Sequence, residues 1–146
     1  MSEDAPGADP GLQGDDLARQ AQEVAGVGAF VLDVATGRVI GFSRTAVEML
    51  DLDPAAGDLP GQARARIHLD DRDRVFEAIE RTRFQGAPFD MDHRIVRASD
   101  GRTRWIRVRA ELADGRVVGT LLDITDRIES ARTIARAQEI AHLGLW

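Results

Sequence analysis

Three runs of alternating polarity in the second half of the chain constrain the fold most. Apolar and polar residues alternate in FDMDHRIV (89–96), in TRWIRVRAEL (103–112) and in much of RVVGTLLDIT (116–125). Successive side chains of a β-strand point to opposite faces, so each run predicts a strand with one buried face. Both links between the runs contain an Asp-Gly pair, which is typical of β-hairpin turns. The segment therefore predicts an antiparallel sheet.

The rest of the chain adds a second hairpin and several helices. Two short apolar runs, 29–34 and 39–42, surround a Gly-containing turn and predict two more strands. Residues 17–25 and 126–141 have helical composition, and residues 51–66 are predicted as loop with a short helical turn. The order predicts an α+β fold, in which helices pack on one face of a five-stranded antiparallel sheet and a further helix flanks each end.

The clearest helix covers residues 67–84, and a short helix capped by Ser43 precedes it. Asp70 is predicted to cap the longer helix. Asp71 and Asp73 fall in its first turn, where the helix dipole favours negative charge. These roles account for the three acidic residues without a cation, so we predict no metal site.

Composition excludes several kinds of chemistry. The 146 residues suit one domain and contain no cysteine, which rules out disulfides, thiolate catalysis and Cys-ligated zinc. No phosphate-binding loop or paired-histidine zinc motif is present, so we predict no catalytic residues. No long apolar run and no apolar signal peptide after Met1 occur, and we predict a cytoplasmic protein without a membrane span.

The formal charge of −6 lies almost entirely at the N-terminus. Residues 1–16 contain five acidic residues, no basic residue and few large apolar ones, which predicts a disordered acidic tail. The remaining residues are nearly neutral in total. They provide no basic field for nucleic acid, so we predict no nucleic-acid partner.

The last ten residues repeat an earlier segment. Residues 137–146 (AQEIAHLGLW) match residues 21–30 (AQEVAGVGAF) at five positions, one of them a glycine, and both segments end on an aromatic residue. An offset of 116 residues is the size of a small domain and indicates a tandem array. Chance similarity of two Ala-rich segments is the alternative. The predicted boundaries are a tail at 1–16, a domain at 17–125, a linker helix at 126–139 and the beginning of a second copy at 140–146.

Four short motifs follow one another along the chain. They are IHLDDRDRV (67–75), FDMDHRI (89–95), DGRTRWI (100–106), and Gly-Thr followed by DITDR within residues 119–127. In this order and spacing they resemble the PAS domain family, in particular the subgroup found in bacterial sensor kinases. Leu69 stands where that subgroup has proline, and His93 stands where it has tyrosine. The resemblance spans roughly residues 20–126 and implies the PAS fold, whose members bind many different ligands or none.

The resemblance implies an internal cavity facing the apolar side of strand 89–96, where His93 lies. One interpretation of His93 is a core histidine hydrogen-bonded to backbone, and the other is a polar anchor for a small ligand or a pH-sensitive group. The residues that would line a ligand pocket are His93, Met91, Phe89, Met49, Phe76, Ile79, Ile106 and Leu121. The alternative is that the same side chains simply fill the core.

The identity of any cofactor is left open. The light-sensing flavin adduct of some PAS domains needs a cysteine and is excluded. Haem is disfavoured, because His68, the histidine that precedes the long helix, belongs to the general signature of the subgroup.

The exit helix is predicted to carry the output. Ile124, Ile128, Ala131 and Ala135 follow steps of four and three residues, which predicts a weak seam for a short coiled coil, with a solvated single helix as the alternative. Contact with a second subunit or a flanking helix is predicted for Trp105, Ile128, Ala131 and Ala135. The residues predicted to relay a signal into the helix are Asp123, Ile124 and Thr125.

These observations predict a sensory PAS module of a multidomain bacterial signal-transduction protein, such as a two-component histidine kinase. The module would form a homodimer and pass the state of a ligand or partner through the exit helix to an output domain in the same chain. It is predicted not to be an enzyme itself. The alternatives are a ligand-free dimerisation or spacer module, and a haem- or flavin-bearing sensor of oxygen or redox state.

Overall fold

A computed structural model describes residues 10–143 of the protein, with side chains from residue 16 onward. Its centre is a five-stranded antiparallel sheet with the order β2-β1-β5-β4-β3. The strands are β1 (Val27–Asp33), β2 (Val39–Phe42), β3 (Phe89–Val96), β4 (Thr103–Ala113) and β5 (Arg116–Asp123). The five-stranded antiparallel sheet predicted from the sequence is confirmed.

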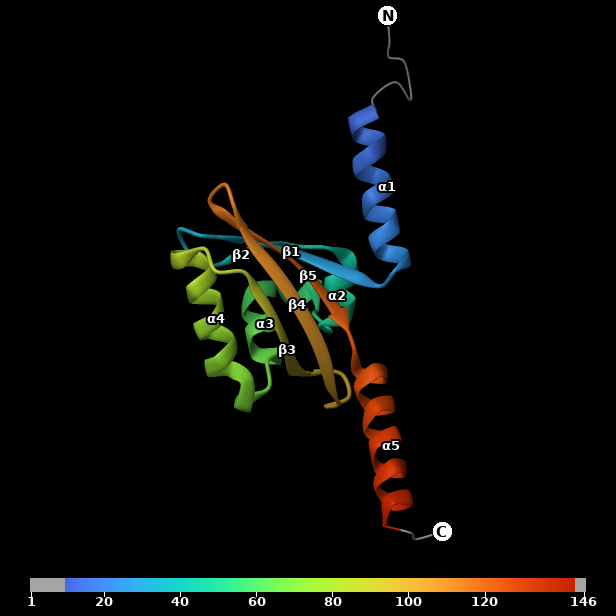
Figure 1. The fold of residues 1–146 in the computed structure, drawn as a ribbon. Helices are drawn as coiled ribbons and strands as arrows, with labels where there is room; N and C mark the ends of the chain where they lie inside the picture. Colours follow the sequence, from blue (N-terminus) through green and yellow to red (C-terminus); the bar gives the residue numbers. More distant parts are fainter. Residues whose placement is uncertain (1–9, 144–146) are drawn as a thin grey trace, which may run out of the picture.

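The helices divide into a covering layer and two flanking helices. Helices α2 (Arg44–Met49), α3 (Leu59–Arg66) and α4 (Arg72–Gln85) cover one face of the sheet, and two short 3-10 turns, η1 (Pro54–Ala56) and η2 (Leu69–Asp71), connect them. Helices α1 (Pro10–Val24) and α5 (Thr125–His142) extend away from this body in opposite directions (Figure 1). Among residues 10–143, no helix has the length and apolar character needed to span a bilayer.

The β4–β5 hairpin follows the turn chemistry expected from its sequence. Asp114 has φ 51° and Gly115 has φ 77°, so both central residues adopt left-handed backbone conformations. Two such residues define the type I′ turn, whose twist matches that of the flanking strands. Ala113 pairs with Arg116 directly beside this turn, and the register continues to Ile106 opposite Asp123.

A glycine allows α2 to approach β1 closely. A Cβ added to Gly28 would lie 2.9 Å from Cα of Ala46, so no larger residue fits at this position without movement of the backbone. Ser43 fixes the same junction, because its Oγ accepts hydrogen bonds from the backbone N–H of Ala29 and of Ala46. The predicted cap of α2 by Ser43 is confirmed.

Two predictions for the segment between α2 and β3 were wrong. Residues 51–66, predicted as loop with a short helical turn, contain the 3-10 turn η1 and also the eight-residue helix α3. Helix α3 forms because Pro60 fits the first helical turn and the carboxylate of Asp58 caps it by accepting from Gly61 N. Asp70 does not cap the next helix; its own backbone N–H donates to Nδ1 of His68. The N-cap position of α4 belongs to Asp71, which makes no capping hydrogen bond.

The flanking helices differ in length from the sequence expectation. Helix α1 begins at Pro10, so residues 10–16 are helical where a disordered tail was predicted. Proline is well suited to the first position of a helix, which needs no N–H donor there. Helix α5 continues to His142 and so includes the first residues assigned to a second domain copy. The remaining parts of both predicted segments, 1–9 and 144–146, lie outside the described residues.

Candidate functional site

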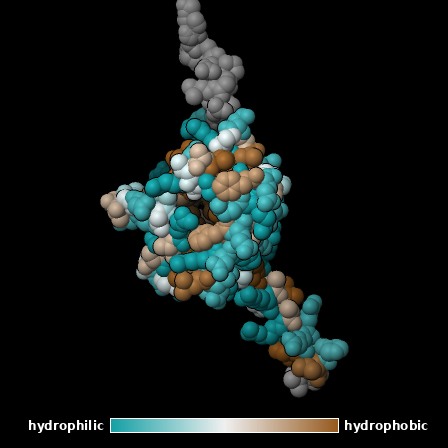
Figure 2. Space-filling view, turned by 90° about the vertical axis from the view of Figure 1, so that its left-hand side faces the viewer, coloured by the Kyte–Doolittle hydropathy of each residue, from teal (hydrophilic) through white to brown (hydrophobic). Residues whose placement is uncertain are grey.

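A cavity of about 640 Å³ lies between the helix-covered face of the sheet and helices α3 and α4. Figure 2 shows the face on the side of α4, which is hollowed near its centre with hydrophobic side chains visible at depth. The inner wall is apolar and is contributed by all five strands and α4. Its members include Phe30, Leu32, Val39, Phe42, Val75, Phe76, Ile79, Phe89, Ile95, Val108, Ala110, Val117 and Leu121.

Charged residues bound the mouth of this cavity. Arg83 of α4 donates to the backbone carbonyl of Val34 at 2.7 and 3.1 Å and to Glu80 at 2.8 Å, which ties α4 to the β1–β2 turn. Arg38 and Asp58 approach within 4.0 Å across the opening, and Arg64 places its guanidinium 4.9 Å from the ring centre of Phe76. The cavity therefore combines an apolar interior with a polar rim.

His93 brings a polar group into the apolar interior. It is only 5% exposed and lines the cavity from β3, and its Nδ1 lies 3.2 Å from the backbone carbonyl oxygen of Arg94. Burial lowers the pKa of His93, although the hydrogen bond to Arg94 and the nearby carboxylates of Asp71 and Asp92 oppose this shift. The buried imidazole is therefore neutral at neutral pH.

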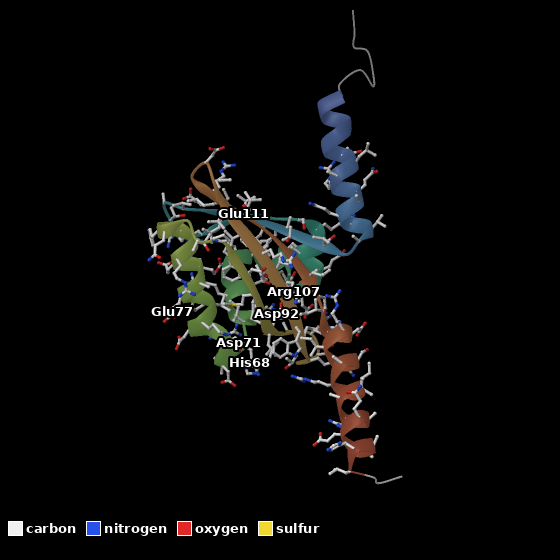
Figure 3. All side chains as sticks on the ribbon, viewed as in Figure 1. His68, Asp71, Glu77, Asp92, Arg107 and Glu111 are labelled. Carbon is white, nitrogen blue, oxygen red and sulfur yellow. The ribbon has the colours of Figure 1, made fainter. Side chains whose placement is uncertain are left out.

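An ion pair holds the start of α4 against β3 beside His93. Asp71 is buried, and its carboxylate accepts from the backbone N–H of Arg94 at 2.7 Å and from its guanidinium at 2.7 and 3.1 Å. These hydrogen bonds hold the pKa of Asp71 well below its usual range. Figure 3 shows Asp71 next to His68 at the N-terminal end of α4. Arg74 adds a second cation, 3.4 Å from the same carboxylate.

On the opposite face of the sheet, Trp105 of β4 lies between two arginines. The guanidinium of Arg94 is 5.5 Å from the centre of the Trp105 ring, and that of Arg132, from α5, is 5.8 Å away. Both distances are within the range of a cation–π contact. Trp105 therefore contacts β3 and the exit helix through the same ring.

The start of α5 is fastened to β4 through the three residues predicted as a relay. The backbone carbonyl of Trp105 accepts from Ile124 N at 2.9 Å, and its N–H donates to Thr125 Oγ1 at 2.9 Å. Thr125 donates in turn to Asp123 from its hydroxyl and its backbone N–H. Burial alone raises the pKa of Asp123, but these bonds and the guanidinium of Arg104 lower it overall. Nη2 of Arg104 lies 2.9 Å from Oδ2 of Asp123, so the two side chains form an ion pair.

A sequence model of the family described as "PAS fold" matches residues 39–121, which is more than half of the chain. The chain belongs to the PAS fold family. No curated protein sequence is matched.

Solved structures of PAS proteins share the fold. A sensory box histidine kinase/response regulator from Burkholderia thailandensis is 24% identical, with a TM-score of 0.68, covering 85% of this chain and 96% of that one. The N-terminal domain of a diguanylate cyclase from Marinobacter aquaeolei is 16% identical, with a TM-score of 0.60 and coverages of 69% and 97%. The RpfR PAS domain from Cronobacter turicensis, in complex with BDSF, is 16% identical, with a TM-score of 0.55 and coverages of 68% and 95%. At these identities the likeness concerns the fold.

The PAS domain brings most of the predicted pocket residues together. Of the eight, His93, Phe89, Phe76, Ile79 and Leu121 line the cavity. The other three belong to the surrounding core: Ile106 is fully buried beside His93 in the sheet register, and Met49 and Met91 pack against the core cluster. Sequence reasoning missed the lining contributed by Phe30 and Val117. The apolar run of β1 was visible in the sequence, but which of its faces meets α4 was not; Val117 lies on the same face of β5 as Leu121, so the alternation in β5 could have located it.

The outer face of the PAS sheet carries cross-strand ion pairs. Asp92 accepts from Arg107 at 2.8 and 3.2 Å, and Asp90 lies 3.5 Å from Arg109; each pair is directly opposite in the β3–β4 register. Hydrogen bonding by Arg107 lowers the pKa of Asp92. Figure 3 shows Asp92 and Arg107 side by side, with Glu111 farther along β4. These arginines are therefore matched by carboxylates of the same sheet.

The remaining predicted contact residues lie on α5. Ile128 is half-buried near the start of the helix, whereas Ala131 and Ala135 are exposed.

No group of three or more histidine, aspartate or glutamate side chains in the described part of the chain is arranged to hold a metal ion. Asp71, which the sequence suggested as a helix-dipole residue, lies at the N-cap position of α4 and also pairs with Arg94.

Proposed function

We propose that this PAS domain is a sensory module that binds a small, mainly apolar ligand in the cavity and signals through α5. The observation that carries the proposal is a cavity of about 640 Å³ whose apolar wall contains one buried imidazole, that of His93. Ligand sites typically combine an apolar interior with a few polar groups that fix orientation. The module would act as a regulatory rather than a catalytic segment.

A contiguous set of contacts supports a route from the cavity to the exit helix. His93 is hydrogen-bonded to the backbone of Arg94, whose side chain contacts Trp105. Trp105 contacts Arg132 through its ring and Thr125 through its backbone N–H. A ligand that shifts β3 would thus change the docking of α5, provided that it binds the two arrangements with different affinity. A coupling of about 1–3 kcal/mol is typical of such switches.

The output domain, the dimer and the tandem array belong to the same proposal. Kinase and cyclase proteins among the structural neighbours support an output domain in the same chain, reached through α5. Dimerisation through the flanking helices and the Ile128, Ala131 and Ala135 side of α5 stays a prediction, as does a cytoplasmic location. The close contact of Gly28 with Ala46 gives the repeated glycine a structural reason, and this supports the beginning of a second PAS copy at residues 140–146.

Native mass spectrometry of gently purified protein tests the ligand. Extra mass on each subunit, lost on denaturation, would support a chemical sensor and identify the compound by its mass. Subunits at the bare polypeptide mass under all purification conditions would favour the ligand-free dimerisation or spacer module. An absorption spectrum of the same sample would reveal the Soret or flavin band expected of the cofactor-bearing alternative.

A cavity-filling variant tests the site. Ala110 is buried in β4 and lines the cavity, so Ala110→Leu should abolish ligand binding while the protein remains folded. Ala113→Leu makes the same change at the exposed end of the same strand and should leave binding unchanged. Equal ligand affinity in the two variants would place the ligand elsewhere.

A further inference from the structure

The donor and acceptor roles of the His93 imidazole follow from its one hydrogen bond. Nδ1 lies 3.2 Å from the carbonyl oxygen of Arg94. A carbonyl oxygen can only accept, so Nδ1 must carry the hydrogen. In a neutral imidazole one ring nitrogen is then a donor and the other an acceptor. Nε2 of His93 is therefore left with a free lone pair.

Nε2 keeps accessible surface on a residue that borders the cavity. It has no hydrogen-bond partner among the described residues. Nor is it sealed in the core: within residues 16–143, Nε of Arg97 is the one fully enclosed side-chain nitrogen or oxygen without a partner. The open space that His93 borders is the cavity. An occupant of the cavity can therefore reach this lone pair.

The other polar groups of the lining are either engaged or lie at the rim. Thr82 is the second buried polar side chain of the described lining, and its hydroxyl donates to the carbonyl of Ala78 within α4. Arg83 is engaged by Val34 and Glu80 at the mouth. The interior thus offers an occupant two side-chain acceptors within apolar walls, Nε2 of His93 and the hydroxyl oxygen of Thr82.

We infer that the cavity selects ligands with an apolar body and a buried N–H or O–H group that donates to Nε2 of His93. This inference rests on the proposed ligand-binding function. A ligand whose inner polar atom can only accept would bring two lone pairs together and leave both without a partner. Sites with a fixed hydrogen-bonding group discriminate strongly against analogues that cannot complete it.

Two small heteroaromatic probes of similar size test this selection. Indole presents an N–H donor, whereas quinoline presents only a nitrogen lone pair. Calorimetric or NMR titration of the full chain should give at least about tenfold tighter binding of indole than of quinoline. His93→Leu should bind indole and quinoline with about equal affinity. Thr82→Val removes the other buried polar group of the lining and should keep the preference, which controls for general changes in the cavity.

The tautomer can be read in the wild-type protein without any variant. Long-range ¹H–¹⁵N correlation spectra at neutral pH should show His93 protonated at Nδ1 and bare at Nε2. A proton on Nε2 would overturn the inference. Equal binding of indole and quinoline by the wild-type protein would overturn it while leaving ligand binding intact, whereas failure of both probes to bind would overturn it together with the proposed function.

Discussion

The carboxylate of Asp71 receives three hydrogen bonds from Arg94, one from the backbone N–H and two from the guanidinium. The pair joins the start of α4 to β3 across 23 residues of sequence. It also borders the candidate site, since Arg94 is the residue whose carbonyl accepts from His93. The cavity wall and the sheet are thus held together at this point by one ion pair.

Loss of this pair should destabilise the domain. In Asp71→Asn the charge is lost and the half-buried guanidinium of Arg94 keeps an incomplete set of acceptors. We expect a loss of about 2 to 3 kcal/mol in the free energy of unfolding, measured by urea denaturation. Asp70→Asn, at the exposed neighbouring position, should change it by less than about 0.5 kcal/mol. Equal effects of the two changes would show that the pair contributes nothing specific.

Acid should remove the same contribution. Because the pKa of Asp71 is lowered on folding, its stabilisation is fully present above the unfolded value near 3.8 and is lost as the pH falls below it. The stability difference between the wild-type protein and Asp71→Asn should therefore be constant from pH 5 to pH 7 and shrink below about pH 4. A difference that persists unchanged into strong acid would contradict this assignment.

His93 should make stability depend on pH near neutrality. Its pKa is lowered in the folded state, chiefly by burial, so the unfolded chain takes up the proton first as the pH falls below the ordinary value of 6.5. Folding stability should then be fully present above that value and decline by up to about 1.4 kcal/mol per pH unit below it. Urea denaturation at pH 7.5 and 5.5 measures this decline. It should flatten in His93→Leu and persist in His142→Gln, which changes an exposed histidine of α5.

Substitution by alanine should affect stability differently at two glycines in neighbouring strands. Gly28→Ala would place a Cβ 2.9 Å from the backbone of Ala46, and we expect about 1–3 kcal/mol of destabilisation from the forced movement of α2. A Cβ at Gly41 of β2 meets nothing within 4 Å, so Gly41→Ala should be neutral or slightly stabilising. Thermal unfolding of the two variants compares them directly. Similar melting temperatures would show that the α2–β1 contact is not tight.

Thr125 should control the attachment of α5. Thr125→Val removes the acceptor of the Trp105 N–H and the hydroxyl donor to Asp123. We expect faster hydrogen exchange in the first turn of α5, by about tenfold, with little change in β3. Thr133→Val is the matched control, because that hydroxyl donates only to the Glu129 carbonyl within the exposed part of the helix. Unchanged exchange after Thr125→Val would remove this residue from the proposed relay.

Much of the fold was predictable because it depends on local patterns. The alternation in β3, β4 and β5 and the Asp-Gly turn at Asp114 located these three strands almost to the residue. The face of β3 that carries His93 was also predictable, since a strand has only two faces. Predictions failed where the cap position of a helix differs by one residue from the expected one, as for Asp70, or where proline starts a helix instead of ending one, as for Pro60.

The sequence by itself determined the strands, their turns, the PAS family and the burial of His93, because periodicity and turn chemistry are properties of short segments. Only the tertiary structure decided the pairing of Asp71 with Arg94, the position of Trp105 between Arg94 and Arg132, and the open side of the His93 ring. Each of these joins residues that are distant in the chain. The pairing of strands and the packing of helices on the sheet bring them together, and a local sequence pattern does not show which distant residues will meet.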